Sequence, residues 1–600
     1  MKHLVCLAIV VALGLWVGFS TEAQIPREGG LGCPNANPKI VPTNCPTIQE
    51  AVNESRPGDT IIILPGTYQE SVKVENKREV IIEAQEPGTV TVKPQSSSEH
   101  VFTYRNSQKW TMRKGIILTG GARGIEINNS TEIVLLDLVI TKNQAEGLAI
   151  LSNSQVEVQG LKITENNSSG ILIDSAPVKA SKTTSSNNGG DGLLLQNKGV
   201  ATLSEMQFTN NKANGVNVNN ASITMGNSAS STNANDGMAL QSASGVISDS
   251  KILNNGKRGI FADRSALSAS NTQVSGHSQN GIELKNSALD LRNKSLISEN
   301  KGNGISADSS SLIVSTSTVT KNNQNGLLFQ SSSADVSDSE VSSDGARGID
   351  MKNSALTTSK TNILGHPSDG LKLDTSSVNL SGGKIADNKG EGISAQNSTV
   401  ALTSVTITNS GANGLLLRDS SANATGSEIS NSSAKGIDAG AASTVTLVDT
   451  NILNNGNDGI QLAQSSAGLR GGTVKGNKAR GIGAQDRSTV ALTGTIVTGN
   501  SGDGVQLVAA SFSLRDGQIS QNGARGINAT DRSAVSVANG TISDNAKDGL
   551  ALANSTAALN GSKVQNNKGT GITADAASVV TCVSTTVSGN ATNLSANVKC

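Results

Sequence analysis

The sequence has few aromatic residues and no excess of either charge. Aromatic residues make up 2% of the 600 residues, and the 48 lysines and arginines equal the 48 aspartates and glutamates. A protein that binds nucleic acid or anionic lipid through its overall charge has a clear basic excess. The balanced composition argues against that class of partner, so we expect no nucleic-acid ligand.

Aromatic rings are also missing from most of the length. Beyond residue 23 the only tryptophan and tyrosines are Trp110, Tyr68 and Tyr104. Aromatic faces supply much of the contact area in many ligand sites. The remaining three quarters of the chain therefore offers no tryptophan or tyrosine on which a sugar ring could stack, and polar side chains would have to bind any glycan there.

A helical pattern is the third absence. No segment of the repeated region has an apolar stripe at a spacing of 3.6 residues that is long enough for a helix, which argues against helical and leucine-rich repeats. Instead, a glycine followed by an aliphatic residue returns every 22 or 23 residues, twenty-one times, from Gly124 to Gly571. A period of this length predicts a solenoid in which each unit stacks on its neighbours.

Each repeat has three short bursts of alternating apolar residues, separated by polar turn formers, which predicts three strands per coil. The unit is therefore one turn of a parallel β-helix with about 22 residues per coil. Asparagine stands four residues before the glycine in fifteen of the copies. It tolerates a left-handed turn, and stacked amides can hydrogen-bond along the axis. We expect an asparagine ladder, whose last members are Asn455, Asn477, Asn500, Asn522, Asn545 and Asn567.

The first residues have the pattern of a secretory signal peptide. Basic residues precede an apolar run from Leu4 to Phe19, and small residues lead to a cleavage site near Ala23. The run is short for a membrane span, although an uncleaved anchor is the alternative. We expect residues 1–23 to be removed, leaving a secreted, periplasmic or cell-surface protein without a stable membrane span.

The mature chain would keep four cysteines, two near each end. A rod of about twenty coils that rises roughly 4.8 Å per coil would hold its ends about 100 Å apart. Pairing should therefore be local, between Cys33 and Cys45 and between Cys582 and Cys600, in an oxidising compartment. These pairs define a lead-in at residues 24–46 and a C-terminal cap at residues 582–600.

The segment between the lead-in and the repeats has its own pattern. Thr47 and Glu50 form the capping box of a short helix, and residues 56–68 form a turn, an apolar strand and another turn. The letters IQEAV and PGDTIIILPGTY, together with the NNxxxGI repeats, resemble the pectin lyase-like right-handed β-helix superfamily. The resemblance implies right-handed coiling, with an N-terminal cap and irregular coils at 47–123 and regular coils at 124–581. It does not define function, because this fold carries lyases, hydrolases, epimerases and adhesins.

The catalytic patterns of better-known members of that superfamily are missing. The polygalacturonase motifs are absent, and so is the Asp-Pro-His-Asp motif of alginate epimerases. The most similar segment is His366-Pro367-Ser368-Asp369. His366 and His277 both stand in the asparagine register, which favours a structural role. The least regular segment, residues 89–123, is the place to look for catalysis, but we interpret its residues as ordinary early coils. Its candidates are His100, Tyr104, Arg105, Lys109, Trp110, Arg113 and Lys114.

Charges alternate in the position just before the glycine, over six coils: Lys435, Asp458, Arg480, Asp503, Arg525 and Asp548. Pectate lyases of the resembled fold combine Ca²⁺-binding acids with a basic arginine. Opposite charges about 4.8 Å apart also form a simple stabilising ladder, which is our interpretation. The acids recur roughly 10 Å apart, at the edge of the glycosidase range. Residues 187–192 resemble only a fragment of a calcium β-roll, so we assign no metal, cofactor or catalytic residue.

These observations favour an exported β-helix with a structural, surface-display or binding role, and a polysaccharide or another surface molecule as partner. The alternative is a carbohydrate-active enzyme, a polysaccharide lyase or related glycan-modifying enzyme. That reading needs long loops that wall a cleft, and the repeat spacing leaves no room for them after Gly124. An ice-binding surface would need an array of Thr-x-Thr, which does not recur from coil to coil.

Overall fold

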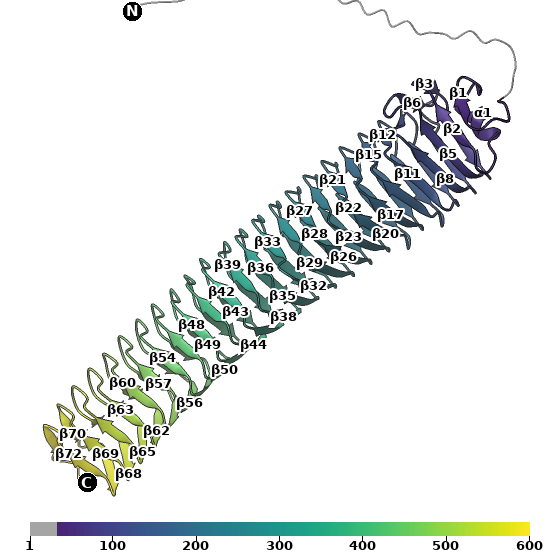
Figure 1. Cartoon of the computed structure of the whole chain (residues 1–600). Helices are drawn as coiled ribbons and strands as arrows, with labels where there is room; N and C mark the ends of the chain where they lie inside the picture. The colour runs from purple at the N-terminus through teal and green to yellow at the C-terminus, as the bar shows by residue number, and fades with distance from the viewer. Residues whose placement is uncertain (1–32) are drawn as a thin grey trace, which may run out of the picture.

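The computed structural model describes residues 33–600 as one long rod of stacked coils, which runs from a helical cap to the last strands (Figure 1). The predicted signal peptide lies outside the described residues. A representative coil contains β25 (Met238–Gln241), β26 (Ser244–Ser248) and β27 (Lys251–Leu253). Equivalent strands of successive coils pair in parallel and form three sheets along the rod. The parallel β-helix with three strands per coil is confirmed.

We name the sheets after this coil: β26 belongs to sheet A, β27 to sheet B and β25 to sheet C. Sheet A has 25 strands and sheet C has 24. Each residue of a strand pairs with the equivalent residue one coil later, so that Leu240 stands beside Ala262 of β28 (Ile260–Asp263). Alternate residues point inward and are buried in one continuous apolar core. This arrangement follows from the period-2 alternation of each strand.

The recurrent glycine stands where successive coils approach most closely. A Cβ atom added to Gly370 would lie 2.7 Å from the carbonyl oxygen of Gly392, its counterpart one coil later. Each of the twenty-one recurrent glycines, from Gly124 to Gly571, would place its Cβ within 3.0 Å of a backbone oxygen of the next coil in the same way. The glycine register is therefore required by close approach of the backbone, because any side chain would collide with the next coil.

Each of the three corners has a buried polar ladder. Between sheets B and C, Asn455 Nδ2 donates to Asn477 Oδ1 at 2.9 Å, as predicted for the asparagine register. Between sheets C and A, the amide of Ser265 donates to Ser287 Oγ at 3.0 Å. Between sheets A and B, the amide of Ser228 donates to Ser250 Oγ at 3.2 Å. These side chains satisfy amides that the corner would otherwise bury without partners.

The N-terminal end of the core is covered by α1 (Ile48–Asn53), which buries Ile48, Ala51 and Val52. The hydroxyl of Thr47 caps it by accepting from the amide of Glu50 at 3.0 Å. The side-chain amide of Gln49 also replaces a neighbouring strand. It accepts from the amide of Lys73 at 2.6 Å and donates to the Lys73 carbonyl at 3.0 Å, at the edge of β4 (Val72–Glu75). Such pairing blocks a strand edge that could otherwise join another chain.

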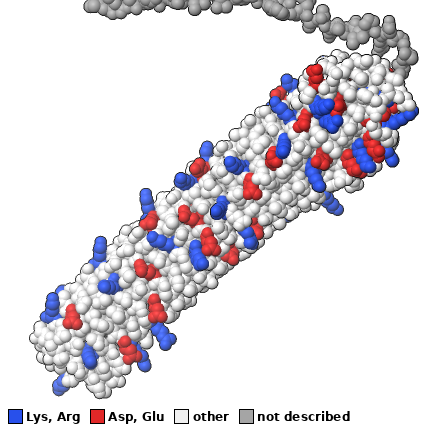
Figure 2. Space-filling model, in the orientation of Figure 1, with Lys and Arg blue, Asp and Glu red and all other residues white. Residues whose placement is uncertain are grey.

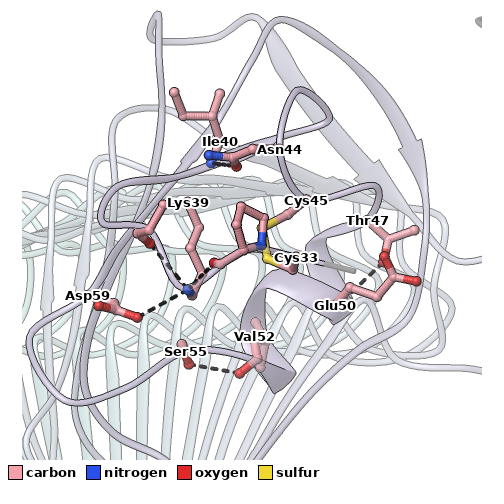
Figure 3. Close-up of a disulfide and its surroundings, with 12 residues drawn as sticks. Cys33, Lys39, Ile40, Asn44, Cys45, Thr47, Glu50, Val52, Ser55 and Asp59 are labelled. Carbon is pink, nitrogen blue, oxygen red and sulfur yellow. Dashed lines mark hydrogen bonds and ion pairs between the residues drawn. A yellow bond between two sulfur atoms is a disulfide. The ribbon is translucent and has the colours of Figure 1, made fainter. Parts of the chain in front are cut away.

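The disulfide between Cys33 and Cys45 lies above this helix, close to a buried lysine (Figure 3). Lys39, in β1 (Lys39–Val41), is fully buried, and its ammonium group donates to the carbonyls of Pro34 and Ala36 at 3.1 and 3.2 Å. Its third partner is the Asp59 carboxylate, 3.5 Å away. The cap therefore compensates a buried charge with polar contacts, as such burial requires.

At the other end, the second predicted disulfide joins Cys582 of β71 (Val579–Val583) to Cys600. The last coil is completed by β72 (Thr586–Ser588) and β73 (Thr592–Leu594). Within residues 33–600, no helix has both the length and the apolar character needed to cross a membrane.

Candidate binding groove

The two aromatic candidates near the N-terminus belong to the core. Tyr104 and Trp110 are fully buried and meet edge to face, with ring centroids 5.9 Å apart. They lie on different sheets, in β7 (Phe102–Arg105) and β8 (Gln108–Arg113). Neither ring has a free face, so they cannot form a stacking platform for a sugar.

The cationic candidates divide into two networks, each centred on a glutamate. On sheet A, Glu83 of β5 (Arg78–Ala84) accepts from Arg113 at 2.5 Å and from Lys114 at 2.7 Å. The remaining candidate on that sheet, Lys109, pairs with Glu79 at the surface, 3.6 Å away. These residues neutralise one another, so sheet A offers no free base there.

On sheet C, Glu126 of β10 (Ile125–Asn128) contacts His100 at 3.2 Å, Arg105 at 3.5 Å and Arg123 at 2.7 Å. Its hydrogen bond with His100, followed by that with Arg123, holds the pKa of Glu126 at about 2. A carboxylate of that pKa keeps no proton to donate near neutral pH. The segment 89–123 thus supplies two separate structural ion-pair networks.

The two histidines of the repeats are buried members of the asparagine ladder. Nδ1 of His277 accepts from the amide of Asn255 at 3.1 Å, while Nε2 lies 3.0 Å from the carbonyl oxygen of Ile252. Burial lowers the pKa of His277, and that of His366, to about 4. Both side chains are neutral at physiological pH and occupied by the backbone.

Asp344 is a carboxylic acid within the same ladder. Its Oδ1 accepts from the amide and Nδ2 of Asn322 at 2.8 and 2.9 Å, whereas its buried Oδ2 has no hydrogen-bond partner. The nearest ionisable group is His366, whose Nδ1 is 3.9 Å from Oδ2. Burial raises the pKa of Asp344 to about 7. An asparagine here would carry an NH₂ group in place of the unpartnered oxygen.

The alternating charges form a ladder with the backbone more than with one another. Asp458 pairs with Arg480 at 2.6 Å and also accepts its amide at 2.9 Å. Asp503 accepts the amide of Arg525 at 2.9 Å, and its second oxygen accepts from Asn528 at 3.0 Å. At the ends of the series, Lys435 pairs with Asp438 of its own coil at 3.3 Å, and Asp548 accepts the amide of Thr570 at 2.8 Å.

Among residues 33–600, no cluster of three or more histidine, cysteine, aspartate or glutamate side chains could hold a metal ion. Figure 2 shows positive and negative side chains interspersed over the visible face of the rod, without an extended area of one sign. Charge therefore does not mark a functional surface on this face.

A groove runs along the corner between sheets C and A. Its cavity has a volume of about 1300 Å³ and extends from Ser242 to Thr399. The floor is formed by the serine ladder and by the first residue of each sheet A strand, such as Ala355 of β41 (Ala355–Ser359). We call this the serine groove. Its rim is formed by the exposed residue at each corner: Ser242, Arg264, Asn286, Ser309, Ser331, Asn353, Thr375 and Asn397.

Seven of the eight rim residues are uncharged hydrogen-bonding side chains, and Arg264 is the exception. The ladder hydroxyls of the floor are already bonded. Ser332 Oγ, for example, donates to the Gln330 carbonyl at 2.7 Å and accepts the Ser310 amide at 3.1 Å. The rim therefore supplies the accessible polar groups. Three of its members also contact the aspartate that precedes them: Ser309 and Thr375 each donate to that carboxylate at 3.0 Å, and Arg264 pairs with Asp263 at 3.1 Å.

A second cavity of about 610 Å³ continues the groove over the outer face of sheet A. Val246 and Ile313 are exposed there, by 46% and 42%. Two acids face the same cavity. Asp290 is paired with Arg292 at 2.5 Å, and Asp335 lies two coils further along. The combined surface is an open trough lined by both polar and apolar groups, and its rim position repeats from coil to coil.

The family model described as right handed beta helix region matches the sequence in overlapping stretches at residues 92–230, 174–316, 214–364, 303–423, 369–514 and 459–598. The chain belongs to the right-handed β-helix family. The family match confirms the predicted hand of the coil. None of the curated proteins matches the sequence.

Solved structures with a similar fold include carbohydrate-active β-helices. The A-module of the Azotobacter vinelandii mannuronan C-5 epimerase AlgE4 is 13% identical, with 59% of this chain and 90% of that chain covered and a TM-score of 0.29. The catalytic domain of a GH87 α-1,3-glucanase is 11% identical, with 61% and 70% covered and a TM-score of 0.27. At these TM-scores the similarity carries no argument about the activity of this right-handed β-helix.

Sequence reasoning missed the serine groove. The sequence feature that marks the groove is a serine six residues after the recurrent glycine. Examples are Ser310 after Gly304, Ser332 after Gly326 and Ser354 after Gly348. Serine is also common at the corner between sheets A and B, so this register does not stand out as asparagine does at the third corner. The groove also depends on the shape of the corner, which composition does not describe.

Proposed function

We propose that this β-helix is an exported, non-catalytic protein that binds an extended, uncharged polysaccharide along the serine groove. The observation that carries the proposal is the repetition of the rim. The same rim position returns in every coil of the groove, about 4.8 Å further along the axis, and carries an uncharged hydrogen-bonding side chain in seven of the eight coils. That spacing is close to the length of one sugar unit in an extended glycan, so successive sugars would meet equivalent side chains.

The chemistry of the trough suits a neutral glycan. Hydroxyl and amide side chains can donate and accept hydrogen bonds with sugar hydroxyls, while the small floor residues leave room for a flat chain. Val246 and Ile313 offer apolar contacts for C–H faces. A polyanion would gain little, because Arg264 is the only positive charge in the lining of the larger cavity.

The enzyme reading has less support within residues 33–600. Asp290 and Asp335 are the acids of the second cavity, and two coils place them roughly 10 Å apart, at or beyond the limit for paired carboxylates in glycosidases. Asp290 is also neutralised by Arg292. Export is supported by the two disulfides, which persist in oxidising compartments, and by the signal-like residues at the start of the sequence.

Affinity electrophoresis of the full chain tests the proposal. Gels containing mixed-linkage β-glucan, mannan or xylan should retard the protein, independently of salt, whereas pectate and alginate should not. Ala355→Trp fills the floor of the groove and should abolish retardation, while Thr406→Trp, on sheet B outside the groove, should not. Retardation by none of the neutral polymers, or equal retardation of both variants, would refute groove binding. New reducing ends after incubation would instead support the enzyme reading.

A further inference from the structure

The length of each coil determines the shape of the groove corner. In the coil that begins at Gly192, 23 residues long, the corner has two consecutive left-handed residues, Asn197 and Lys198. The strands on both sides stay in register with the preceding coil. The extra residue is therefore accommodated within the corner itself, where both side chains are exposed. A two-residue corner must extend further from the rod than a one-residue corner.

A second two-residue corner lies beyond the other end of the groove. The 23-residue coil of Gly436 has Ala441 and Ala442 at this corner, both left-handed and exposed. Between these two sites the corner has one left-handed residue in ten successive coils: Asn220, Ser242, Arg264, Asn286, Ser309, Ser331, Asn353, Thr375, Asn397 and Asp419. One coil in this run also has 23 residues, but its extra residue lies at the other end of sheet A, at Asn293–Lys294.

The cavity follows this pattern of corners. Its lining begins at Ser242 and ends at Thr399, inside the run of one-residue corners. Beyond Ala442 the corner alternates between one and two left-handed residues, with single residues at Gln464 and Ala509 and pairs at 486–487 and 531–532. An alternating rim cannot form a continuous channel, so the groove is a local feature of a rod whose coils are otherwise alike.

We propose that the two-residue corners at Asn197–Lys198 and Ala441–Ala442 close the ends of the groove, so that it binds one finite internal segment of a polysaccharide. This inference rests on the proposed function. The run of one-residue corners between these two-residue corners has ten coils, one more than the cavity at each end, and at about 4.8 Å per coil it is about 45 Å long, or about ten sugar units of an extended chain. A longer polymer gains no further contacts unless it rises over the projecting corners.

Binding should therefore depend on chain length in a specific way. Each added sugar places another unit over an equivalent rim residue, so affinity should rise with length until the groove is full and then level off. A rod with a groove along its whole length would behave differently, because affinity would continue to rise and several proteins would bind along one chain.

The experiment uses a length series of β-1,4-linked gluco-oligosaccharides and manno-oligosaccharides, and titration calorimetry with the full chain. In the central variant, one asparagine is inserted after Asn353, which creates a two-residue corner in mid-groove. The matched control has one lysine inserted after Lys360, at the other end of the same sheet A strand, where Asn293–Lys294 is the native precedent. Native corners such as Asp486–Arg487 show that the fold accommodates the central insertion.

We expect the native chain to reach its plateau near about ten sugars, the central variant at about half that length, and the control at the native length. Affinity that keeps rising beyond the groove length, or a central variant identical to the control, would overturn the finite groove while leaving polysaccharide binding intact. If the longest neutral oligosaccharides and the parent polymers do not bind at all, the proposed function fails as well.

Discussion

The N-terminal coils and the regular repeats are joined along the axis by different contacts. In the first coils, glutamates such as Glu83 and Glu126 each bind two lysine or arginine side chains from neighbouring segments, and Tyr104 and Trp110 fill the core. In the repeats, uncharged asparagine and serine ladders carry most corner contacts. The difference shows that the same coiled backbone can be held together along the axis either by ion pairs or by ladders of uncharged side chains.

The constancy of coil length explains where ladders and where ion pairs occur. A ladder needs the same side chain at the same place in every coil, so it suits a segment of constant coil length. The first coils vary in length and end against α1, which removes that constancy. Ion pairs with long, flexible side chains tolerate such variation, although they depend more on pH and salt than neutral ladders do. The following substitutions test this division.

The largest effect is expected at Asp344, a carboxyl group within the neutral ladder. Its pKa is about 7 in the folded protein and about 3.9 in an unfolded chain. The folded state holds the proton more tightly, so stability is undiminished below about pH 4 and falls as pH rises through 7. The loss at about pH 8 is on the order of 4 kcal/mol.

Asp344→Asn should recover that stability at about pH 8 and change little at about pH 4, as measured by thermal unfolding and by hydrogen exchange in the surrounding coils. His366 faces the same carboxyl group, but its pKa of about 4 keeps it neutral over most of this range. An equal gain at both pH values would show that ionisation of Asp344 is not the cause.

The second test concerns backbone approach within the repeats. In Gly370→Ala the added Cβ would lie 2.7 Å from the Gly392 carbonyl oxygen, and we expect a loss of about 3 kcal/mol. Gly468→Ala is the control, because no heavy atom lies within 4 Å of its added Cβ. Its unfolding free energy should change by less than about 0.5 kcal/mol. Equal effects in urea unfolding would contradict the role of glycine in close coil contact.

The third test removes the charge at the centre of an N-terminal network. Glu126→Gln removes the carboxylate that His100, Arg105 and Arg123 share, while Arg123 keeps its pair with Glu146 at 2.7 Å, and should cost about 1–2 kcal/mol. Because the folded pKa of Glu126 is about 2, its contribution is present above about pH 4.5 and declines as pH falls toward 2. Glu157→Gln, on the exposed face of β14 (Val156–Gln159), is the control.

Urea unfolding near neutral pH and in acid would measure both variants. The Glu126→Gln deficit should shrink in acid, whereas the Glu157→Gln variant should match the native protein throughout. A deficit that does not change with pH would mean that shape or hydrogen bonding, rather than charge, makes Glu126 important.

The fold was predictable because glycine, asparagine and apolar alternation recur at one period, and each has a direct physical cause in a stacked coil. The groove was not predictable from the sequence. Its position depends on which corner of a 23-residue coil takes the extra residue, and the repeat length alone does not show this. Lys198 and Lys294 both accompany such insertions, yet only the strand register places the first beside the groove corner and the second at the far end of sheet A. The sequence also did not show which charged side chains would pair: Lys435 pairs with Asp438 of its own coil instead of with Asp458 of the next one.

The smallest effect is expected in the alternating charges of the repeats. Asp503 accepts two hydrogen bonds, from the Arg525 amide and from Asn528, but no ion pair with Arg480 or Arg525 is present among the described residues. Asp503→Asn preserves the oxygen that the amide needs and should cost less than about 0.5 kcal/mol. Asp503→Lys removes both acceptors and adds a third cation between Arg480 and Arg525, for a loss of about 1 kcal/mol that salt should reduce. Thermal unfolding at low and high ionic strength separates the two variants. Losses of equal size would mean that the negative charge itself stabilises the column, and that the repeats rely on ion pairs as the first coils do.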